Sequence, residues 1–268
     1  LTSKTLESMG IEYKIIVEKQ EYKNYSAVID KRKILILDET YKQKYDAFTN
    51  DETLGKGSGP ARNFCWEHSI AEGHERHWLL DDNIDGFFLK NKATRYLVKN
   101  PNFFRPMEDF IDRYTNVALA GPNYKMFVPR KWKRPVFTVN TRVFSCILIN
   151  NQLPIRWRCR YNEDVDLSIR SLKLGWCNIL FNNFLQGKMT TQTVKGGNTD
   201  LLYKDGTEKK SEMLKRAHPD VVELTIRYGR PHHKVDFRQW KNRRLKLKDG
   251  VKIESGVNNY GMTLRKKD

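Results

Sequence analysis

The sequence lacks the long hydrophobic runs of a membrane protein. No window approaches the roughly 18 consecutive apolar residues that a transmembrane helix requires. The opening residues, Leu1 to Lys4, contain no apolar segment of the kind found in a signal peptide. We therefore expect a soluble, cytoplasmic protein without a membrane partner.

Cysteine is scarce and has no pairing pattern. The four cysteines, Cys65, Cys146, Cys159 and Cys177, lie far apart, with no Cys-x-x-Cys pair and no neighbouring histidine. This spacing suggests neither a structural zinc site nor a disulfide framework. We expect reduced thiols that are mostly buried.

The chain also lacks internal repeats and a long Pro-, Ser- or Gly-rich linker. Its 268 residues are 39% hydrophobic and 12% aromatic, a composition that favours a folded protein over a disordered one. Apolar segments alternate with helix-like ones, which is typical of an α/β fold. We predict one α/β domain over residues 1–237 and a basic C-terminal extension over residues 238–268.

Acidic residues are outnumbered by basic ones. The 49 Lys and Arg residues exceed the 32 Asp and Glu residues and give a formal net charge of +17. Such an excess favours a polyanionic partner, and nucleic acid is the first candidate. An anionic membrane face or a phosphorylated metabolite would be attracted by the same charge.

Hydrophobic periodicity and Gly/Pro signals predict the order of the elements. Helices are expected at 5–9, at 60–73, from residue 162 onward and at 208–217. In the second helix, one face contains Ala61, Phe64, Cys65, His68 and Ala71. Strands are expected at 13–17, 33–37, 77–80, 136–139, 143–149, 177–184 and 222–227, with loops at 51–60 and 195–198.

The first candidate site is Asp81-Asp82-Asn83, directly after the apolar strand Trp78-Leu79-Leu80. Ligands of open α/β sheets bind at the carboxyl ends of strands. Adjacent carboxylates repel one another, and a hard divalent cation would remove that cost. The simpler alternative is an acidic turn that caps the following element.

The second candidate is Asn162-Glu163-Asp164-Val165-Asp166, at the start of an amphipathic helix. Acidic residues stabilise a helix N-terminus without any catalytic role. Three acids in four positions exceed that need, and helix geometry turns Asp166 away from Asp164. One carboxylate facing a cleft can act as a general base while another holds a basic side chain.

The third candidate is the helix start Gly59-Pro60-Ala61-Arg62-Asn63. Arg62 and Asn63 suit a phosphate, a ribose or a base edge, and the exposed backbone N–H groups would add to an anion site. An arginine on a solvated helix face is the alternative.

Two basic runs interleave tryptophan with cations, a composition suited to phosphate contact and base stacking. The first consists of Lys131, Trp132, Lys133 and Arg134, and the second contains Arg238, Trp240, Lys241, Arg243 and Arg244. A solvated basic face is the alternative for both runs, and Trp132 would also suit a core position.

Together these motifs resemble those of the TET/JBP-associated glycosyltransferases, a GT-A fold family. The resemblance rests on Ala61-Arg62-Asn63, Asp81-Asp82-Asn83 and Tyr161-Asn162-Glu163-Asp164, and further on Lys195-Gly196-Gly197-Asn198, His218-Pro219-Asp220 and Arg230 to Asp236. It covers residues 5–237. The family includes phage enzymes thought to place sugars on hydroxymethylated DNA bases.

The resemblance implies a Rossmann-like, nucleotide-sugar-binding mixed sheet flanked by helices. It implies transfer of a sugar from a UDP-sugar to the hydroxymethyl group of a modified pyrimidine in DNA, with 5-hydroxymethylcytosine favoured, in the host cytoplasm if the protein is phage-encoded. The donor would contact Arg62, Asn63, Asp81, Asp82, Lys188, Gly196 and Gly197. Mn²⁺ or Mg²⁺ would bind Asp81, Asp82, Asn83 and His233. Asp164 would be the general base, with Glu163 beside it.

Two features depart from the family pattern. Asn83, a neutral oxygen ligand, stands at the last position of the Asp-x-Asp metal motif, and the strand that usually opens a GT-A domain is not found before residue 5.

Other classes explain part of the pattern. A two-metal nuclease or nucleotidyltransferase acting on DNA would use Asp81, Asp82, Glu163, Asp164 and Asp166 as ligands, but would leave the Ala-Arg-Asn helix unexplained. A GT-A enzyme acting on a glycan or protein would make the charge incidental. A non-catalytic DNA-binding module would not need the carboxylates.

Overall fold

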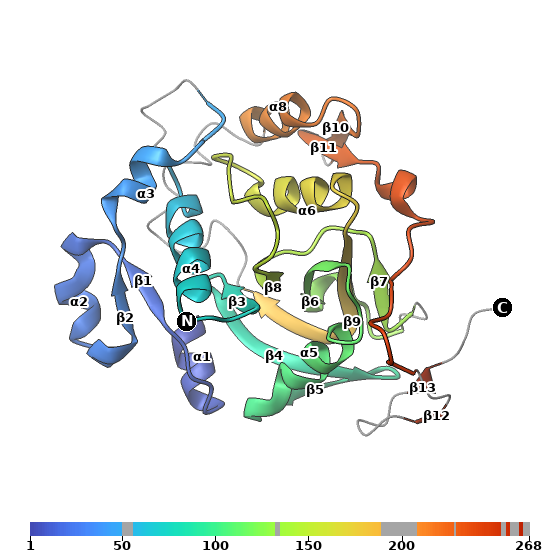
Figure 1. Ribbon diagram of the computed structural model, residues 1–268, viewed down its shortest axis with the longest axis horizontal. Coiled ribbons are helices and arrows are strands. Elements are labelled where there is room, and N and C mark those ends of the chain that lie inside the picture. Colours follow the sequence, from blue (N-terminus) through green and yellow to red (C-terminus); the bar gives the residue numbers. More distant parts are fainter. Residues whose placement is uncertain are drawn as a thin grey trace.

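A mixed seven-stranded β-sheet forms the centre of the computed structural model (Figure 1). The structure describes residues 1–49, 56–131, 135–188, 208–227 and 229–252, and the backbone of 256–257 and 263–264. The strands follow the order β3-β8-β6-β9-β4-β5, with β7 paired to β9; β6 and β9 are parallel and the other neighbours antiparallel. Their bounds are β3 Arg76–Leu80, β4 Ile84–Asn91, β5 Thr94–Val98, β6 Val117–Tyr124, β7 Phe137–Val139, β8 Cys146–Asn150 and β9 Cys177–Lys188.

Helices cover both faces of this sheet, because successive strand residues point to opposite faces. In β8, Cys146 and Leu148 pack with α1 (Thr2–Ser8) and α5 (Arg105–Ile111). Ile147 and Ile149 pack on the other face with α4 (Gly59–Ala71) and α6 (Glu163–Lys173). The predicted Rossmann-like mixed sheet with flanking helices is therefore confirmed.

A second, small sheet lies on the other side of α4 from the central sheet (Figure 1). It pairs β1 (Ile15–Val17) in parallel with β2 (Ile34–Ile36). The helices of this region are α2 (Tyr22–Ser26), α3 (Glu39–Lys44) and the 3₁₀ turns η1 (Lys19–Glu21) and η2 (Lys31–Lys33). Two further 3₁₀ turns, η4 (Pro101–Phe103) and η5 (Lys125–Phe127), connect elements of the central sheet.

The C-terminal elements pack on α6. They are α8 (Glu208–Ala217), the antiparallel hairpin of β10 (Val222–Arg227) and β11 (Arg230–Val235), and the turn η6 (Phe237–Trp240). One apolar cluster joins Val165 and Ile169 of α6 to Leu214, Val222 and Trp240. This cluster holds α8 and the hairpin against α6.

The basic extension begins as a docked segment. The backbone of Lys246 accepts hydrogen bonds from Thr115 N at 2.8 Å and from the Thr115 hydroxyl at 3.4 Å, and the carbonyl of Arg244 accepts one from the Asn116 amide at 3.0 Å. A β-bridge joins Tyr114 and Leu247. Beyond it, β12 (Gly256–Val257) and β13 (Thr263–Leu264) pair with each other.

Most predicted elements are present, with ends shifted by a few residues. In α4, Trp66 is fully buried, while Cys65 and His68 border a cavity. The elements that the sequence did not predict include α2, α3, α5, β4, β5, β6 and β11. In β6, Gly121 resembles a turn signal but is required by packing, because a Cβ there would lie 2.2 Å from the Cys146 carbonyl oxygen.

The expectation that most of the thiols are buried is confirmed. All four are free thiols, with Cys146, Cys159 and Cys177 buried and Cys65 half-buried. Across the described ranges, none of the helices has both the length and the apolar character that a membrane span requires.

Candidate active site

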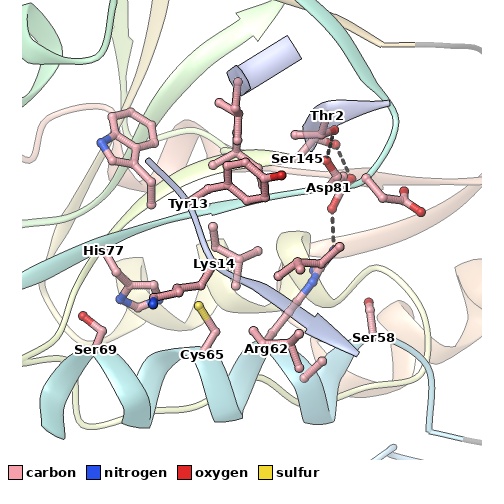
Figure 2. Close-up of a pocket in the computed structure, with 18 of the residues that line it drawn as sticks. Thr2, Tyr13, Lys14, Ser58, Arg62, Cys65, Ser69, His77, Asp81 and Ser145 are labelled. Carbon is pink, nitrogen blue, oxygen red and sulfur yellow. Dashed lines mark hydrogen bonds and ion pairs between the residues drawn. The ribbon is translucent and has the colours of Figure 1, made fainter. Parts of the chain in front are cut away.

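A cavity of about 2130 Å³ opens between the small sheet, α4, and the end of β3. Helix α4 contributes Arg62, Cys65 and Ser69 to its wall, and its N-cap residue Ser58 continues the same row; the four residues are three or four positions apart and share one helix face (Figure 2). Its far end reaches the first turn of α6, so one cavity brings together all three motifs that the sequence singled out.

Arg62 connects two of these motifs. Its guanidinium donates to Asp81 Oδ1 at 2.8 Å and lies 3.2 Å from Glu163 Oε1, and it stacks over the Trp157 ring at 4.7 Å. The Arg62 side chain is 13% exposed. The three contacts fix the guanidinium between the strand end and α6.

Asp81 is the centre of the polar network (Figure 2). Its Oδ2 atom accepts from Lys188 Nζ at 2.7 Å and from Ser145 Oγ at 2.7 Å, while Arg62 holds Oδ1. Burial opposes ionisation of this carboxyl, but the charges of Arg62 and Lys188 outweigh it and hold the pKa of Asp81 below its usual value. Asp81 therefore stays ionised and orients two cations.

Lys188 ends β9, beside the start of β4. Besides Asp81, its ammonium contacts Ser145 Oγ at 2.8 Å and Tyr124 Oη at 3.4 Å. Burial disfavours its charged form, yet Asp81 raises the pKa of Lys188 above its ordinary value. The cation is thus fixed at the cavity wall, and its contact with a donor stays a prediction.

Sequence reasoning missed Ser145, Tyr124 and Thr2. Ser145 has a left-handed backbone (φ 63°), and its hydroxyl bonds both Asp81 and Tyr124. The Thr2 hydroxyl donates to the backbone carbonyl of Asp81 at 2.5 Å and accepts from Ile84 N at 2.9 Å. These residues come from separate elements and carry no local motif, so only the fold reveals them.

Asp164 differs from Asp81 in that its pKa is raised rather than lowered. Burial, followed by the charge of Glu163, raises the pKa of Asp164 to about 6, while Arg62 limits the shift. One of its oxygens accepts from Val165 N at 2.8 Å. A carboxyl that faces a ligand cavity with a pKa near neutrality has the properties of a general base.

Glu163 lies beside Asp164, and its carboxylate contacts both Ser58 and Arg62. Its Oε1 atom accepts from Ser58 Oγ at 3.1 Å, in addition to the contact with Arg62. Asn162, which precedes it, adopts a left-handed backbone (φ 53°) that asparagine tolerates, and its amide donates to the Lys210 carbonyl at 2.8 Å. The turn thereby joins α6 to α8 at the active site.

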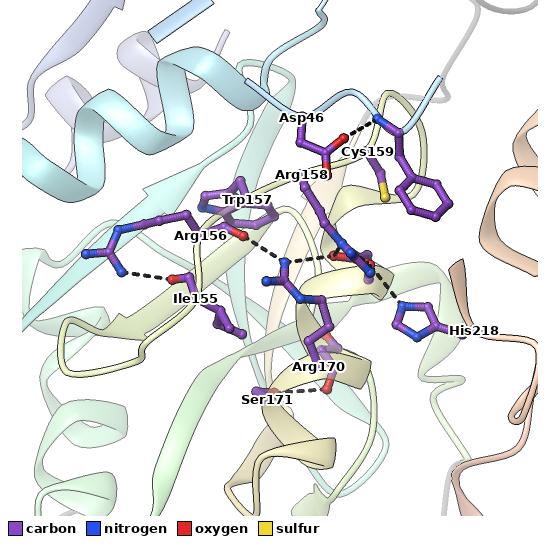
Figure 3. Close-up of polar contacts among 12 residues, drawn as sticks. Asp46, Ile155, Arg156, Trp157, Arg158, Cys159, Arg170, Ser171 and His218 are labelled. Carbon is purple, nitrogen blue, oxygen red and sulfur yellow. Dashed lines mark hydrogen bonds and ion pairs between the residues drawn. The ribbon is translucent and has the colours of Figure 1, made fainter. Parts of the chain in front are cut away.

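Asp166 points away from the cavity, as helix geometry predicts. It is fully buried and paired with Arg158 at 2.9 Å, Arg170 at 3.3 Å and His218 at 2.9 Å. Figure 3 shows Arg158, Arg170 and His218 converging from three elements. Burial opposes ionisation of Asp166, but the hydrogen bonds from His218 and Arg158 lower its pKa. This network supports the site without lining it.

The residues do not fit the expected metal site. Both oxygens of Asp81 are bound to cationic side chains, and Asp82 is exposed. Asn83 has a buried side-chain oxygen without a hydrogen-bond partner, which supplies one neutral ligand. In the described ranges, no group of three or more His, Cys, Asp and Glu side chains is arranged to hold a metal ion.

His233 does not join Asp81 to Asn83 either. Its ring nitrogen lies 3.4 Å from Ser211 Oγ of α8. Burial and the nearby positive charges of Lys210, Arg142 and His232 lower the pKa of His233 to about 4. Positive surroundings disfavour a metal ion at this ring. The expected Mn²⁺ or Mg²⁺ stays a prediction.

Two other donor contacts differ from expectation. Asn63 does not line the cavity: its amide oxygen accepts from Trp157 N at 2.9 Å and its amide nitrogen donates to the Trp157 carbonyl at 3.0 Å. It therefore supports the ring on which Arg62 stacks. Gly196 and Gly197 lie outside the described residues.

The basic residues divide into exposed and structural ones. Lys131, Arg238, Lys241 and Arg244 are exposed, as nucleic-acid contact requires. Trp240 is 6% exposed and packs in the core, so its ring is not available for stacking on a base. Arg243 donates to the carbonyl oxygens of Leu172 and Trp176 and caps the end of α6. Trp132, Lys133 and Arg134 lie outside the described residues.

The family profile of the TET-Associated Glycosyltransferases matches residues 1–197. The chain belongs to the TET-Associated Glycosyltransferase family. This glycosyltransferase has Arg62, Asp81, Glu163, Asp164 and Lys188 within the matched region, whereas α8 and the β10–β11 hairpin follow it. Neither the curated proteins nor the solved structures include a significant match to the chain.

Proposed function

We propose that the protein transfers a sugar from a UDP-sugar to the hydroxymethyl group of a modified pyrimidine in DNA, with 5-hydroxymethylcytosine as the favoured acceptor. The observation that carries this proposal is a pair of carboxyls whose pKa values move in opposite directions within one cavity of a glycosyltransferase. Asp81 stays ionised and holds Arg62 and Lys188, while Asp164 has a raised pKa. Such a separation assigns a charge-organising role to one carboxyl and a proton-transfer role to the other.

In the proposed reaction, Asp164 accepts the proton of the acceptor hydroxyl while the oxygen of that hydroxyl attacks the anomeric carbon of the sugar. A new C–O bond forms there, and the bond between that carbon and the donor diphosphate breaks, so UDP leaves with the electron pair. Lys188 and Arg62 stand at the cavity wall where charge develops on the leaving diphosphate. Attack from the face opposite the diphosphate gives inversion.

The charge of the chain supports DNA as the acceptor. A net charge of +17 attracts a phosphate backbone, and Lys131, Arg238, Lys241 and Arg244 are exposed for that contact. Asp164 lies inside a cavity, which a base stacked in duplex DNA does not reach. The acceptor base must therefore leave the stack, as in other enzymes that modify bases.

The experiment is nucleoside mass spectrometry after incubation of hydroxymethylcytosine DNA with the protein and a panel of UDP-sugars. Parallel samples contain Mn²⁺, Mg²⁺ or EDTA, so that the prediction of a metal is tested separately. We expect one nucleoside to gain the mass of a sugar residue. This gain should be lost with Asp164→Asn, because the substitution keeps the size of the side chain and removes the carboxylate that acts as the general base.

Other outcomes would contradict the proposal. Cleaved DNA in samples without any sugar nucleotide would support the nuclease alternative. Hydrolysis of a UDP-sugar with no sugar added to either hydroxymethylcytosine DNA or hydroxymethyluracil DNA would point to a glycan or protein acceptor.

A further inference from the structure

The β10–β11 hairpin has an apolar face that continues past the core into solvent. In the antiparallel register, Val222 opposes Val235, Leu224 opposes His233, and Ile226 opposes Pro231. Val222 is 1% exposed, but Leu224 is 52% and Ile226 67% exposed. Both aliphatic side chains project from the same face of the ribbon, because alternate residues of a strand share a face.

The end of the same hairpin is cationic. Arg227 opposes Arg230 at the last rung, and both are exposed. By the same alternation, Arg227 and Arg230 share the opposite face with Glu223 and Lys234, which pair at 3.4 Å. The end of the ribbon thus carries two guanidinium groups on one face and exposed aliphatic surface on the other, a combination that fits the phosphates and the sugar and base edges of a nucleic-acid groove that receives the ribbon.

The hairpin lies next to the catalytic residues. Figure 1 shows β10 and β11 beside α8 and over α6. His233 contacts Ser211 in the first turns of α8, and the neighbouring Lys210 carbonyl receives the hydrogen bond from Asn162 at the start of α6. Asp164 follows two residues later. The rung of Ile226 and Pro231 lies two rungs beyond that of Leu224 and His233, so the exposed end begins where α8 meets the turn that carries Asp164.

We propose that this hairpin is the groove-binding element that holds DNA beside Asp164. Arg227 and Arg230 contact phosphates, and Ile226 and Leu224 pack against sugars and base edges. Two-stranded ribbons enter DNA grooves in other proteins, and aliphatic side chains there wedge between base steps. Such a wedge lowers the cost of bringing the acceptor base out of the stack. The inference rests on DNA as the acceptor in the proposed function.

Two variants separate the two contributions. Arg227→Ser with Arg230→Ser removes the cations, and Ile226→Thr removes the wedge while keeping a β-branched residue. The β4–β5 hairpin provides matched controls on another exposed ribbon: Lys92→Asn with Lys99→Ser, and Leu97→Thr, where Leu97 is 55% exposed. Thermal unfolding of all four proteins checks that they fold.

The first measurement is fluorescence anisotropy with an unmodified DNA duplex and no donor, over a range of salt concentrations. The double arginine variant should bind about tenfold more weakly, with a slope of log Kd against log salt reduced by about 1.8, as expected for two lost phosphate contacts. The second is the fluorescence of 2-aminopurine in the duplex, which rises when a base leaves the stack. Ile226→Thr should lose most of that rise and keep the salt slope.

The outcomes distinguish this inference from the proposed function. If wild-type protein glycosylates DNA and the hairpin variants bind DNA as the controls do, the inference is wrong and the proposed function stands. If no DNA is glycosylated, the binding data still show whether the hairpin contacts DNA. Preferential binding to vesicles of phosphatidylserine and phosphatidylcholine, weakened by the hairpin variants, would replace DNA by a lipid surface.

Discussion

At the scale of single residues, Asp164 combines a functional requirement with a cost to the fold. Its raised pKa, about 6, means that the basic form dominates only above that pH. We predict that kcat/KM rises with unit slope below pH 6 and reaches a plateau above it. Asp164→Asn should lower kcat by about 10²- to 10⁴-fold, the usual contribution of a general base. A pH–rate profile of sugar transfer measures both effects.

The same pKa predicts an effect on stability. A carboxyl whose pKa is raised by folding stabilises the fold at low pH, and this contribution is lost as the pH rises through the folded value. Asp164→Asn should therefore raise the melting temperature at pH 8 and leave it unchanged at pH 4. Asp109→Asn on α5, a residue that does not line the cavity, is the control. A destabilised Asp164→Asn protein at pH 8 would contradict the assigned environment.

Lys188 carries the second prediction at this scale. Lys188→Met removes one partner of Asp81 and a cation from the cavity wall to which we propose that the donor diphosphate binds. UDP should bind about 10- to 100-fold more weakly, the range for a lost hydrogen bond to a charged group. Because the variant removes the cation from Asp81 Oδ2 and leaves the Ser145 hydroxyl bonded there, it should also gain affinity for Mn²⁺, seen by electron paramagnetic resonance.

Isothermal calorimetry with UDP, in EDTA and in Mn²⁺, measures the first effect, and Lys188→Arg is the conservative control. Unchanged UDP affinity in Lys188→Met would show that the lysine only holds Asp81. Strong Mn²⁺ uptake by the wild type would show that a metal displaces the lysine.

At the scale of elements, the buried network around Asp166 fixes α6 against α8 and the loop before α6. His218 follows the end of α8, and Arg158 lies in that loop. Asp166→Asn leaves two half-buried arginines without their buried counter-charge, which costs about 3–5 kcal/mol of unfolding free energy. Lys173→Ala breaks the exposed pair with Asp220 and should cost about 1 kcal/mol or less.

Urea denaturation of both variants gives the comparison. Similar losses in the two variants would mean that the buried network adds nothing beyond an exposed ion pair.

Part of the site could be predicted because some of its residues belong to local sequence motifs. Asp81, Arg62 and Asp164 could be found because each stands at the end of a strand or the start of a helix with a clear local pattern. Lys188 was reached only through the family resemblance. Ser145 and Tyr124 could not be found, because they meet Asp81 through the pairing of β3 with β8 and of β8 with β6.

The fold shows the same division. Helices α6 and α8 have strong 3.6-residue periodicity and were predicted, α8 with the observed bounds. Strand β6 was not predicted, because Gly121 and Pro122 within it resemble a turn. Gly121 fits in the strand because of its packing against the neighbouring strand β8, which the local sequence pattern does not reveal. Trp240 was read as a DNA contact from the surrounding cations, whereas the apolar cluster on α6 buries it.

At the scale of the whole molecule, the docked start of the basic extension is part of the domain. Trp240 is buried against α6, and Arg243 caps the last turn of that helix. A chain that ends after residue 237 should lose about 3 kcal/mol or more, as for removal of a buried tryptophan. A chain that ends after residue 252 keeps these contacts and should unfold near the full-length temperature.

Differential scanning calorimetry of the two truncated chains tests this. Equal melting temperatures would mean that the segment is an appendage, as the sequence alone suggested.

The position of Arg62 has a consequence for the order of proton and ligand binding. One guanidinium bonds Asp81 and Glu163 and also limits the pKa of Asp164. If the donor diphosphate binds the Arg62 guanidinium, the positive charge of Arg62 offsets less of the negative charge of Asp164. The pKa of Asp164 then rises, and the carboxyl takes up a proton more readily when the donor is bound. Donor binding and protonation are then thermodynamically linked. The heat of UDP binding near pH 6.5 should accordingly vary with the ionisation enthalpy of the buffer, and that variation should vanish in Asp164→Asn.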